Sequence, residues 1–350
     1  MRKYAPILSY ATLCTLIVAA SQLGVLNGYV QLVIMYVGIN IILSTSLNVV
    51  NGYMGEFSVG HAGFMAVGAY VASILNVMLF TESSTFGPPL LSPSSAIYLF
   101  PVTLIAGGTA AALAGLLVAV PSFKTRGDYL AIITLAVNYI VKSSVENIQP
   151  IGGARGFMGM RNVIDSMGKV LNLPWPMIWV FICVGLSVWI IHRLVNSTWG
   201  KGIVALRDDE IAAEIMSINT HRMKITAFML SSGLAGIAGG LFAHVLGYIN
   251  PGTFTIMKST EALVMVYLGG MGSLSGSVIS AIVFTLALEA FRPLGIIKWV
   301  VVPLLLILLM LFRPEGIMGQ RELGDIFKRK VTGQGLGVGG DKRRPVTPNP

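Results

Sequence analysis

The sequence predicts an all-α, polytopic integral membrane protein that crosses the bilayer about ten times, within a range of roughly 8 to 11 helices. Hydrophobic residues make up 54% of the 350 positions and charged residues only 11%, and the mean hydropathy is +0.77. Soluble domains carry about a quarter charged residues, so this composition argues against a soluble protein. The 40 glycines are typical of helices that pack closely in lipid.

Ten apolar segments account for the expected crossings. A spanning helix needs about 20 apolar residues to cross about 30 Å of hydrocarbon. One segment, Ser259–Leu268, is short and weakly apolar, so some crossings are expected to be short or broken. The others are Ile7–Gly24, Tyr29–Val50, Ala62–Phe80, Ala96–Val120, Tyr129–Val145, Met177–Leu194, Ile225–Leu246, Ser277–Phe291 and Ile296–Phe312.

The distribution of basic residues predicts the orientation. Most lysines and arginines fall on the side that also holds both termini, and positive loops stay in the cytoplasm, so both termini are expected inside. The net charge of +9 therefore reads as a topology signal and as contact with anionic lipid, and no basic and aromatic interleaving suggests nucleic-acid binding. We expect one membrane domain over residues 1–319, and a basic, Gly- and Pro-rich tail over residues 320–350 that is disordered in the cytoplasm.

Glycines interrupt the apolar region between the second and third predicted spans. A broken helix at membrane depth requires protein or a water-filled cavity around its freed backbone. Ser58 is expected to cap the new helix, whose amides then point at a substrate carboxylate. The alternative is a cytoplasmic loop in which Gly60 and Gly63 serve helix packing, and the lone His61 is expected to be structural. The candidate pathway residues are Asn51, Gly52, Gly55, Ser58, Gly60, His61 and Gly63.

The most polar stretch in the body of the chain lies in the predicted cytoplasmic loop 197–222. A short amphipathic helix is expected over Arg207–Ile218, with Ile211, Ile215 and Ile218 on one face. Acids begin this helix and cover its polar face, which suits a protein groove better than an anionic membrane. The candidate docking residues are Arg207, Asp208, Asp209, Glu210, Ala213, Glu214 and Ser217.

A third segment, Leu268–Gly276, is rich in glycine. It lacks the Gly-Lys-Ser/Thr ending of a nucleotide-binding loop, so it is expected to be a tight turn or, alternatively, backbone that lines the pathway. The two cysteines, Cys14 and Cys183, lie inside apolar runs and imply neither a disulfide nor a metal site.

Several blocks of sequence resemble the LivM-type permeases of branched-chain amino-acid ABC importers. They occur in family order and cover residues 40–319, which makes them specific for the family and less so for the substrate. The blocks are Leu47–Phe64, Gly68–Tyr70, Arg126–Ile132, Gly152–Gly156, Ala205–Glu214, Tyr267–Ser273 and Phe312–Gly316. One departure is Ser217, where the family often has glycine, and this puts the turn after the docking helix in doubt.

The resemblance implies a multi-pass subunit of the bacterial inner membrane that moves leucine, isoleucine and valine inward. It further implies a related second permease, two cytoplasmic ATP-binding subunits and a soluble substrate-binding protein, with ATP used by the partners and no cofactor bound by this chain. Urea or another small amino-acid or carboxylate substrate remains an alternative. A secondary transporter is disfavoured because Glu56, Glu261 and Glu289 lie near predicted helix ends, an intramembrane enzyme lacks a visible catalytic group, and a channel leaves the acidic helix unexplained.

Overall fold

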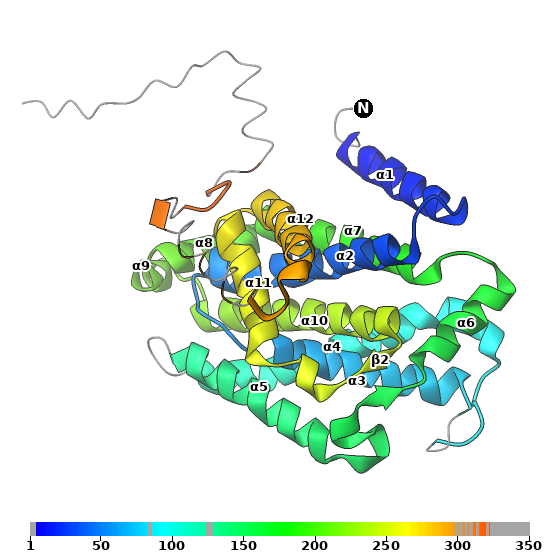
Figure 1. The fold of residues 1–350 in the computed structure, drawn as a ribbon. Coiled ribbons are helices and arrows are strands. Elements are labelled where there is room, and N and C mark those ends of the chain that lie inside the picture. Colours follow the sequence, from blue (N-terminus) through cyan, green and yellow to red (C-terminus); the bar gives the residue numbers. More distant parts are fainter. Residues whose placement is uncertain are drawn as a thin grey trace, which may run out of the picture.

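The computed structural model describes residues 5–82, 86–123 and 129–297, together with residues 300, 304, 307, 311, 312, 315–319 and 322. Helices dominate this part of the chain (Figure 1). They are α1 (Ala5–Gln22), α2 (Gly28–Asn48), α3 (His61–Phe80), α4 (Ala96–Ser122), α5 (Tyr129–Asn147), α6 (Met160–Val170), α7 (Trp175–Val195), α8 (Thr198–Asp208), α9 (Glu210–Ile215), α10 (Thr220–Leu246), α11 (Ile256–Gly269) and α12 (Leu274–Ala290).

Short elements join the helices. A π-helical turn, Val49–Met54, extends α2, and 3₁₀ turns cover Pro93–Ser95, Gln149–Ile151, Gly153–Arg155, Pro251–Thr253 and Arg292–Ile297. Strands β1 (Phe157–Met158) and β2 (Tyr248–Ile249) pair antiparallel, with Phe157 opposite Ile249. This two-stranded sheet lies at the end of α10 that is remote from α8 and α9 (Figure 1).

Helix α10 forms the centre of the bundle, where it packs extensively on α3, α4 and α2. Small residues allow the backbones to approach closely: a Cβ added to Gly68 of α3 would stand 2.2 Å from Gly236 Cα of α10. Apolar burial does not drive helices together in lipid, so close van der Waals packing of this kind supplies much of the association energy. The glycine content read from the sequence is therefore used at the helix crossings.

Five helical segments are long and apolar enough to cross a membrane, judged by length and composition of the described residues. They are Gly28–Met54, His61–Phe80, Pro93–Ser122, Trp175–Val195 and Thr220–Leu246, and shorter apolar helices cover Leu8–Gln22 and Leu274–Ala290. The predicted class, an all-α multi-pass membrane protein, is thereby supported, while the total of about ten crossings and the side of the termini stay predictions.

The C-terminal predictions are only partly covered by the structure. The expected span from Ile296 to Phe312 lies mostly outside the described residues, and of the expected tail 320–350 only Glu322 is described.

Candidate functional site

The predicted interruption between the second and third spans is present in the structure. The π-helical turn ends at Met54, Gly55 adopts a left-handed conformation with φ 76°, and the chain stays non-helical until α3 begins at His61. A left-handed residue ends a helix at little steric cost only when it lacks a Cβ, which explains the glycine at position 55.

The expected cap at Ser58 is wrong. The residue that precedes α3 is Gly60, and it makes no side-chain capping bond. Asn51 instead holds the backbone of Ser58: its Oδ1 accepts from the Ser58 N–H at 3.3 Å, and its Nδ2 donates to the Ser58 carbonyl at 3.5 Å. The Ser58 hydroxyl is buried and has no hydrogen-bond partner within the described part of the chain.

Two of the first amides of α3 have acceptors within the protein. The Ala62 N–H donates to Ser259 Oγ of α11 at 3.0 Å, and the Gly63 N–H donates to the Gly60 carbonyl at 3.0 Å. These two amides are therefore engaged by the protein and do not face an open anion site, contrary to the expectation from the sequence.

Gly60 and Gly63 lie against α5. A Cβ at Gly60 would meet the Thr134 carbonyl oxygen at 2.4 Å, and a Cβ at Gly63 would meet Asn138 Cα at 3.0 Å. These contacts favour the packing alternative for both glycines. His61 is buried, and its Nε2 lies 2.8 Å from Ser46 Oγ, which agrees with the structural role expected for it.

The predicted docking helix is two helices, which corrects the expectation of one helix over Arg207–Ile218. Arg207 and Asp208 end α8, the backbone turns at Asp209 (φ −160°, ψ 109°), and α9 begins at Glu210. The Asp209 carboxylate accepts from the amides of Ile211 at 2.9 Å and Ala212 at 3.0 Å. A short side-chain acceptor competes with helix continuation in this way, so Asp209 serves better as an N-cap than as an interior residue.

Helix α9 presents an apolar face to its surroundings. The side chains of Ile211, Ile215 and Met216 are 71%, 78% and 77% exposed, whereas Ala213 is buried. Glu214 accepts a hydrogen bond from Thr220 Oγ1 at 3.0 Å and so ties α9 to the start of α10. A six-residue helix is too short to be stable alone, so this face suits a surface on a partner.

Ser217 ends α9 in a left-handed conformation. Its φ is 63°, and among the described residues it is the only non-glycine residue with a positive φ. The Ile218 N–H reaches back to the Ala213 carbonyl at 3.1 Å, which is the bond that closes a glycine-type helix end. Ser217 therefore stands where the family often has glycine and where the backbone conformation itself favours glycine.

Polar contacts join the two predicted sites. Lys224 of α10 lies 2.7 Å from Glu56 Oε1 in the interruption and 2.8 Å from Glu210 Oε1 in α9. Arg207 Nη1 donates to the Gly52 carbonyl at 3.2 Å. There is no room for a side chain at Gly55, because an added Cβ would lie 2.5 Å from Arg207 Cγ. Through Arg207 and Lys224, helices α8 and α9 are thus both in contact with the interrupted segment.

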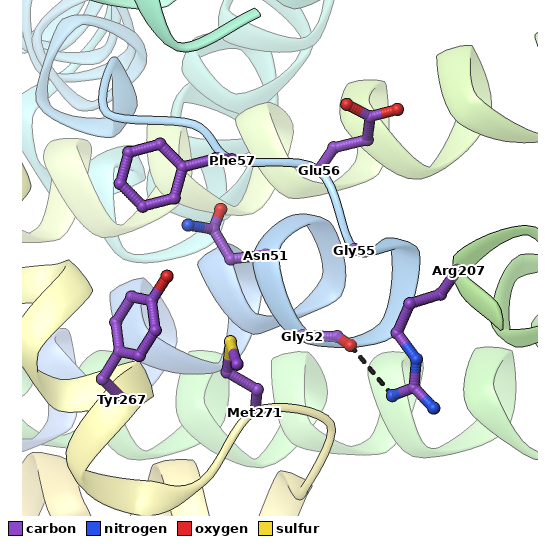
Figure 2. A pocket seen from close by; sticks show the side chains of 8 residues that line it. All are labelled: Asn51, Gly52, Gly55, Glu56, Phe57, Arg207, Tyr267 and Met271. Atoms are coloured by element: carbon purple, nitrogen blue, oxygen red, sulfur yellow. Dashed lines mark hydrogen bonds between the residues drawn. The ribbon is translucent and has the colours of Figure 1, made fainter. Parts of the chain in front are cut away.

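A pocket of about 320 Å³ lies at this junction (Figure 2). Figure 2 shows Glu56 and Phe57 of the interruption at the top, Arg207 at the right beside Gly52 and Gly55, and Tyr267 and Met271 below. The lining residues are Asn51, Gly52, Gly55, Glu56, Phe57, Arg207, Tyr267 and Met271. Of the predicted pathway residues, Asn51, Gly52 and Gly55 thus line a cavity, and Ser58, Gly60, His61 and Gly63 do not line it.

The glycine-rich third segment is a tight turn that also reaches this junction. It joins α11 to α12 with left-handed residues at Gly270 and Gly272, and the Gly272 N–H donates to Asn48 Oδ1 at 3.0 Å. Glu322 caps α12, because its carboxylate accepts from the Leu274 and Ser275 amides at 2.7 and 3.1 Å. A carboxylate at a helix N-terminus is stabilised by the free amides and the helix dipole.

Sequence reasoning missed four residues at this junction. They are Lys224, Glu56, Tyr267 and Glu322, and from the sequence alone none of them is a candidate for the contacts it makes here. No short-range pattern signals these roles, because each partner lies far away along the chain.

Comparisons with known proteins agree with this architecture. Residues 29–312 match the family described as "Branched-chain amino acid transport system / permease component". The LivM permease of Escherichia coli K12 is 33% identical over 80% of this chain and 68% of its own length, and that of Salmonella typhimurium LT2 is 31% identical with the same coverage. The LivH permease of Escherichia coli K12 is 33% identical over 36% of this chain and 42% of its own length.

No solved structure matches the chain. The relatives are transport components rather than enzymes, as expected from the sequence. The family match spans the interruption, helices α8 and α9 and the glycine-rich turn, and on that ground the chain belongs to the branched-chain amino acid transport system permease family.

Proposed function

We propose that this chain is one of two related permease subunits of an ABC importer that carries leucine, isoleucine and valine inward across a bacterial inner membrane. The LivM and LivH relatives, which are both named as branched-chain amino acid permeases, support the substrate class and the pairing of two permeases. In this proposal two separate subunits hydrolyse ATP, and an extracytoplasmic binding protein delivers the substrate.

The exposed apolar face of α9 is the observation that carries the coupling part of the proposal. The side chains of Ile211, Ile215 and Met216 are exposed, and α9 lies beside α8 at one end of the bundle (Figure 1). If a groove of an ATP-binding subunit buries Ile211 and Ile215, each contributes about 1.5–3 kcal/mol to the free energy of docking. Helix α9 then serves as the docking element, which is shorter than the helix predicted over Arg207–Ile218.

The ties between α9 and the membrane bundle supply the route for coupling. Nucleotide-driven closure of the ATP-binding subunits displaces α9, and Lys224 links Glu210 of α9 to Glu56 of the interruption. Arg207 links α8 to Gly52 in the same way. Coupling between sites requires such a contiguous element with two arrangements, and the pocket at the junction is the space that changes when the interruption moves.

The function is tested by purifying the complex with its partner subunits in proteoliposomes. Uptake and ATP hydrolysis are measured over a panel of amino acids together with urea. Uptake of leucine, isoleucine and valine that depends on ATP and on the binding protein supports the proposal. Uptake of urea alone assigns the same machinery to another substrate, and accumulation driven by an ion gradient without ATP contradicts the proposal.

The docking role of α9 is tested separately by Ile215→Asp, which places a charge on the exposed face. The ATP-binding subunits should dissociate from the purified permease pair, while the permease itself still inserts. Val170→Asp is the matched control, because Val170 is also exposed but ends α6 at the opposite end of the bundle. Retention of the ATP-binding subunits by the Ile215 variant contradicts the docking role.

A further inference from the structure

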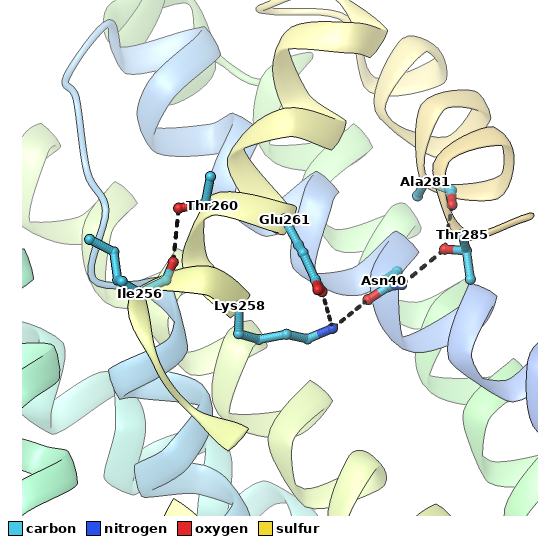
Figure 3. A network of polar contacts seen from close by, with 7 residues as sticks. All are labelled: Asn40, Ile256, Lys258, Thr260, Glu261, Ala281 and Thr285. Atoms are coloured by element: carbon cyan, nitrogen blue, oxygen red, sulfur yellow. Dashed lines mark hydrogen bonds and ion pairs between the residues drawn. The ribbon is translucent and has the colours of Figure 1, made fainter. Parts of the chain in front are cut away.

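A charged pair lies inside the helical bundle, away from the junction described above. Lys258 Nζ of α11 stands 2.8 Å from Glu261 Oε2 on the same helix and 3.5 Å from Asn40 Oδ1 of α2 (Figure 3). Asn40 Nδ2 in turn donates to Thr285 Oγ1 of α12 at 2.9 Å. Three helices therefore converge on one polar network.

Helix lengths place this pair at membrane depth. Asn40 stands near the middle of the 27-residue helical segment Gly28–Met54, which spans about 40 Å at 1.5 Å per residue. Helix α11 has 14 residues and reaches only about 21 Å, less than the roughly 30 Å of hydrocarbon. Because Lys258 Nζ reaches Asn40 Oδ1, the first turns of α11, which carry Lys258 and Glu261, lie at the depth of the middle of that longer segment. Glu261, expected near a helix end, lies beside the centre of α2.

The pair retains capacity for a ligand. The side chains of Lys258 and Glu261 are 15% and 17% exposed, so neither is sealed from an approaching molecule. The lysine ammonium has three donors, and its contacts within the described part of the chain use two of them. Glu261 Oε1 accepts no hydrogen bond from the described residues, while Oε2 holds the lysine.

Aromatic side chains border the charged pair. Lys258 Nζ lies 5.9 Å from the centroid of the Phe242 ring, and that ring packs on Tyr36 of α2 with centroids 5.9 Å apart. Tyr36 precedes Asn40 by one helical turn, so it lies on the same face of α2. Next to two opposite charges the bundle thus offers an apolar wall suited to an aliphatic side chain.

We propose that Lys258 and Glu261, positioned by Asn40, form a membrane-embedded binding site for a zwitterionic α-amino acid with an aliphatic side chain. Lys258 receives the carboxylate, Glu261 receives the ammonium group, and the Tyr36 and Phe242 rings border the side chain. This inference rests on the proposed function and adds to it a selective site in the permease itself.

The electrostatic reason is that a zwitterion leaves no charge without a partner. Without a substrate the two side chains neutralise each other, and with an amino acid inserted each still faces an opposite charge. Unpaired charges at membrane depth are costly, so a ligand with only a carboxylate or only an ammonium group is rejected. The site therefore selects against 2-oxo acids and simple amines of the same shape.

The test uses the full complex in proteoliposomes and compares leucine uptake with ATP hydrolysis stimulated by the leucine-loaded binding protein. The variants are Lys258→Met, Glu261→Gln and the neutral double variant. We expect each to lower uptake at least tenfold, while stimulated ATP hydrolysis stays within twofold of the wild type. The double variant is decisive. If the pair is only structural, removing both charges leaves no unpaired charge and uptake recovers. If the pair binds a zwitterion, uptake stays low.

The matched control is Lys142→Met with Glu146→Gln, which removes a helical ion pair on α5 with 27% and 34% side-chain exposure. Leucine uptake should stay within twofold of the wild type in that control. Near-normal uptake by the neutral double variant of Lys258 and Glu261 overturns the inference. Where a neutral variant does not assemble, Glu261→Asp keeps both charges and shortens the reach by one methylene. Leucine transported per ATP should then fall at least about threefold, and an unchanged ratio also overturns the inference.

Wild-type complexes that take up none of leucine, isoleucine and valine would instead contradict the proposed function. The two failures are therefore distinguishable, because one concerns the wild type and the other concerns only the variants.

Discussion

Lys224→Met removes the cation that joins the interruption to α9 and keeps a side chain of similar length. Lys224 is 11% exposed, and its two carboxylate partners, Glu56 and Glu210, are 23% and 47% exposed. The substitution leaves both carboxylates without this partner, so it should weaken the seating of α9 on the bundle.

The two contacts differ in strength because their solvent exposure differs. The half-exposed contact with Glu210 contributes about 0.2–1 kcal/mol, as surface ion pairs do. The contact with Glu56 is more buried and is short, so its loss costs about 2–3 kcal/mol, including the desolvated carboxylate that remains. Only the contact with Glu210 joins Lys224 to α9, so its loss shifts the equilibrium between seated and released α9 by less than about fivefold. The loss of the contact with Glu56 instead loosens the interruption, by roughly 100-fold.

Hydrogen–deuterium exchange in the assembled complex measures both effects, on the α9 amides and on the amides of the interruption, residues 55–60. Lys224→Met should raise exchange of the interruption amides roughly 100-fold and that of the α9 amides less than about fivefold, and it should lower the amount of substrate moved per ATP. Glu210→Gln is the internal control, since it breaks only the contact with α9 and should leave exchange of the interruption amides unchanged. Unchanged exchange of the interruption amides in an assembled Lys224→Met complex would refute this reasoning.

Three further predictions concern stability and topology. Ser217→Gly should slow amide exchange at the end of α9 and stabilise that turn by about 1 kcal/mol, since glycine adopts φ 63° without strain; faster exchange would contradict this. Gly60→Ala should lower the thermal stability of the permease by about 1–3 kcal/mol, because the new Cβ meets a backbone oxygen of α5 at 2.4 Å. In the control Gly168→Ala, the Cβ meets nothing within 4 Å, so stability should not fall. In a background free of the native cysteines, an impermeant thiol reagent added to intact cells should modify Lys169→Cys and spare Gly337→Cys, and labelling of the latter would contradict a cytoplasmic C-terminus.

A Gly60→Val variant cannot by its transport activity distinguish a pathway role of Gly60 from a packing role. The sequence leaves open whether Gly60 serves packing or the pathway, and a bulky side chain would disturb either role. Because Gly60 contacts the Thr134 carbonyl, the same substitution disturbs the α3–α5 contact. Gly52 and Gly55, which line the pocket, are the glycines at which the pathway role remains a prediction.

Apolar periodicity and glycine placement were sufficient to predict the class of protein and most helix positions. The expected span Ala62–Phe80, for example, differs from α3 by one residue. Such elements are predictable because the bilayer imposes a minimum length and requires backbone hydrogen bonds within each segment. Local rules also placed acids near the start of α9, although the break at Asp209 was missed because its capping bonds compete with helix continuation.

The sequence by itself determined that this is a multi-pass permease with an interrupted helix and an acidic segment between two spans, because each of these features depends on residues that are neighbours along the chain. Only the tertiary structure decided that Lys224 joins Glu56 to Glu210 and that Lys258 and Glu261 lie beside Asn40. It also showed that Ser58 does not cap α3 and that Asn51 holds the Ser58 backbone. The physical reason is that a charge buried among helices finds its partner through packing, and Lys258 and Asn40 are brought together across 218 positions of the chain.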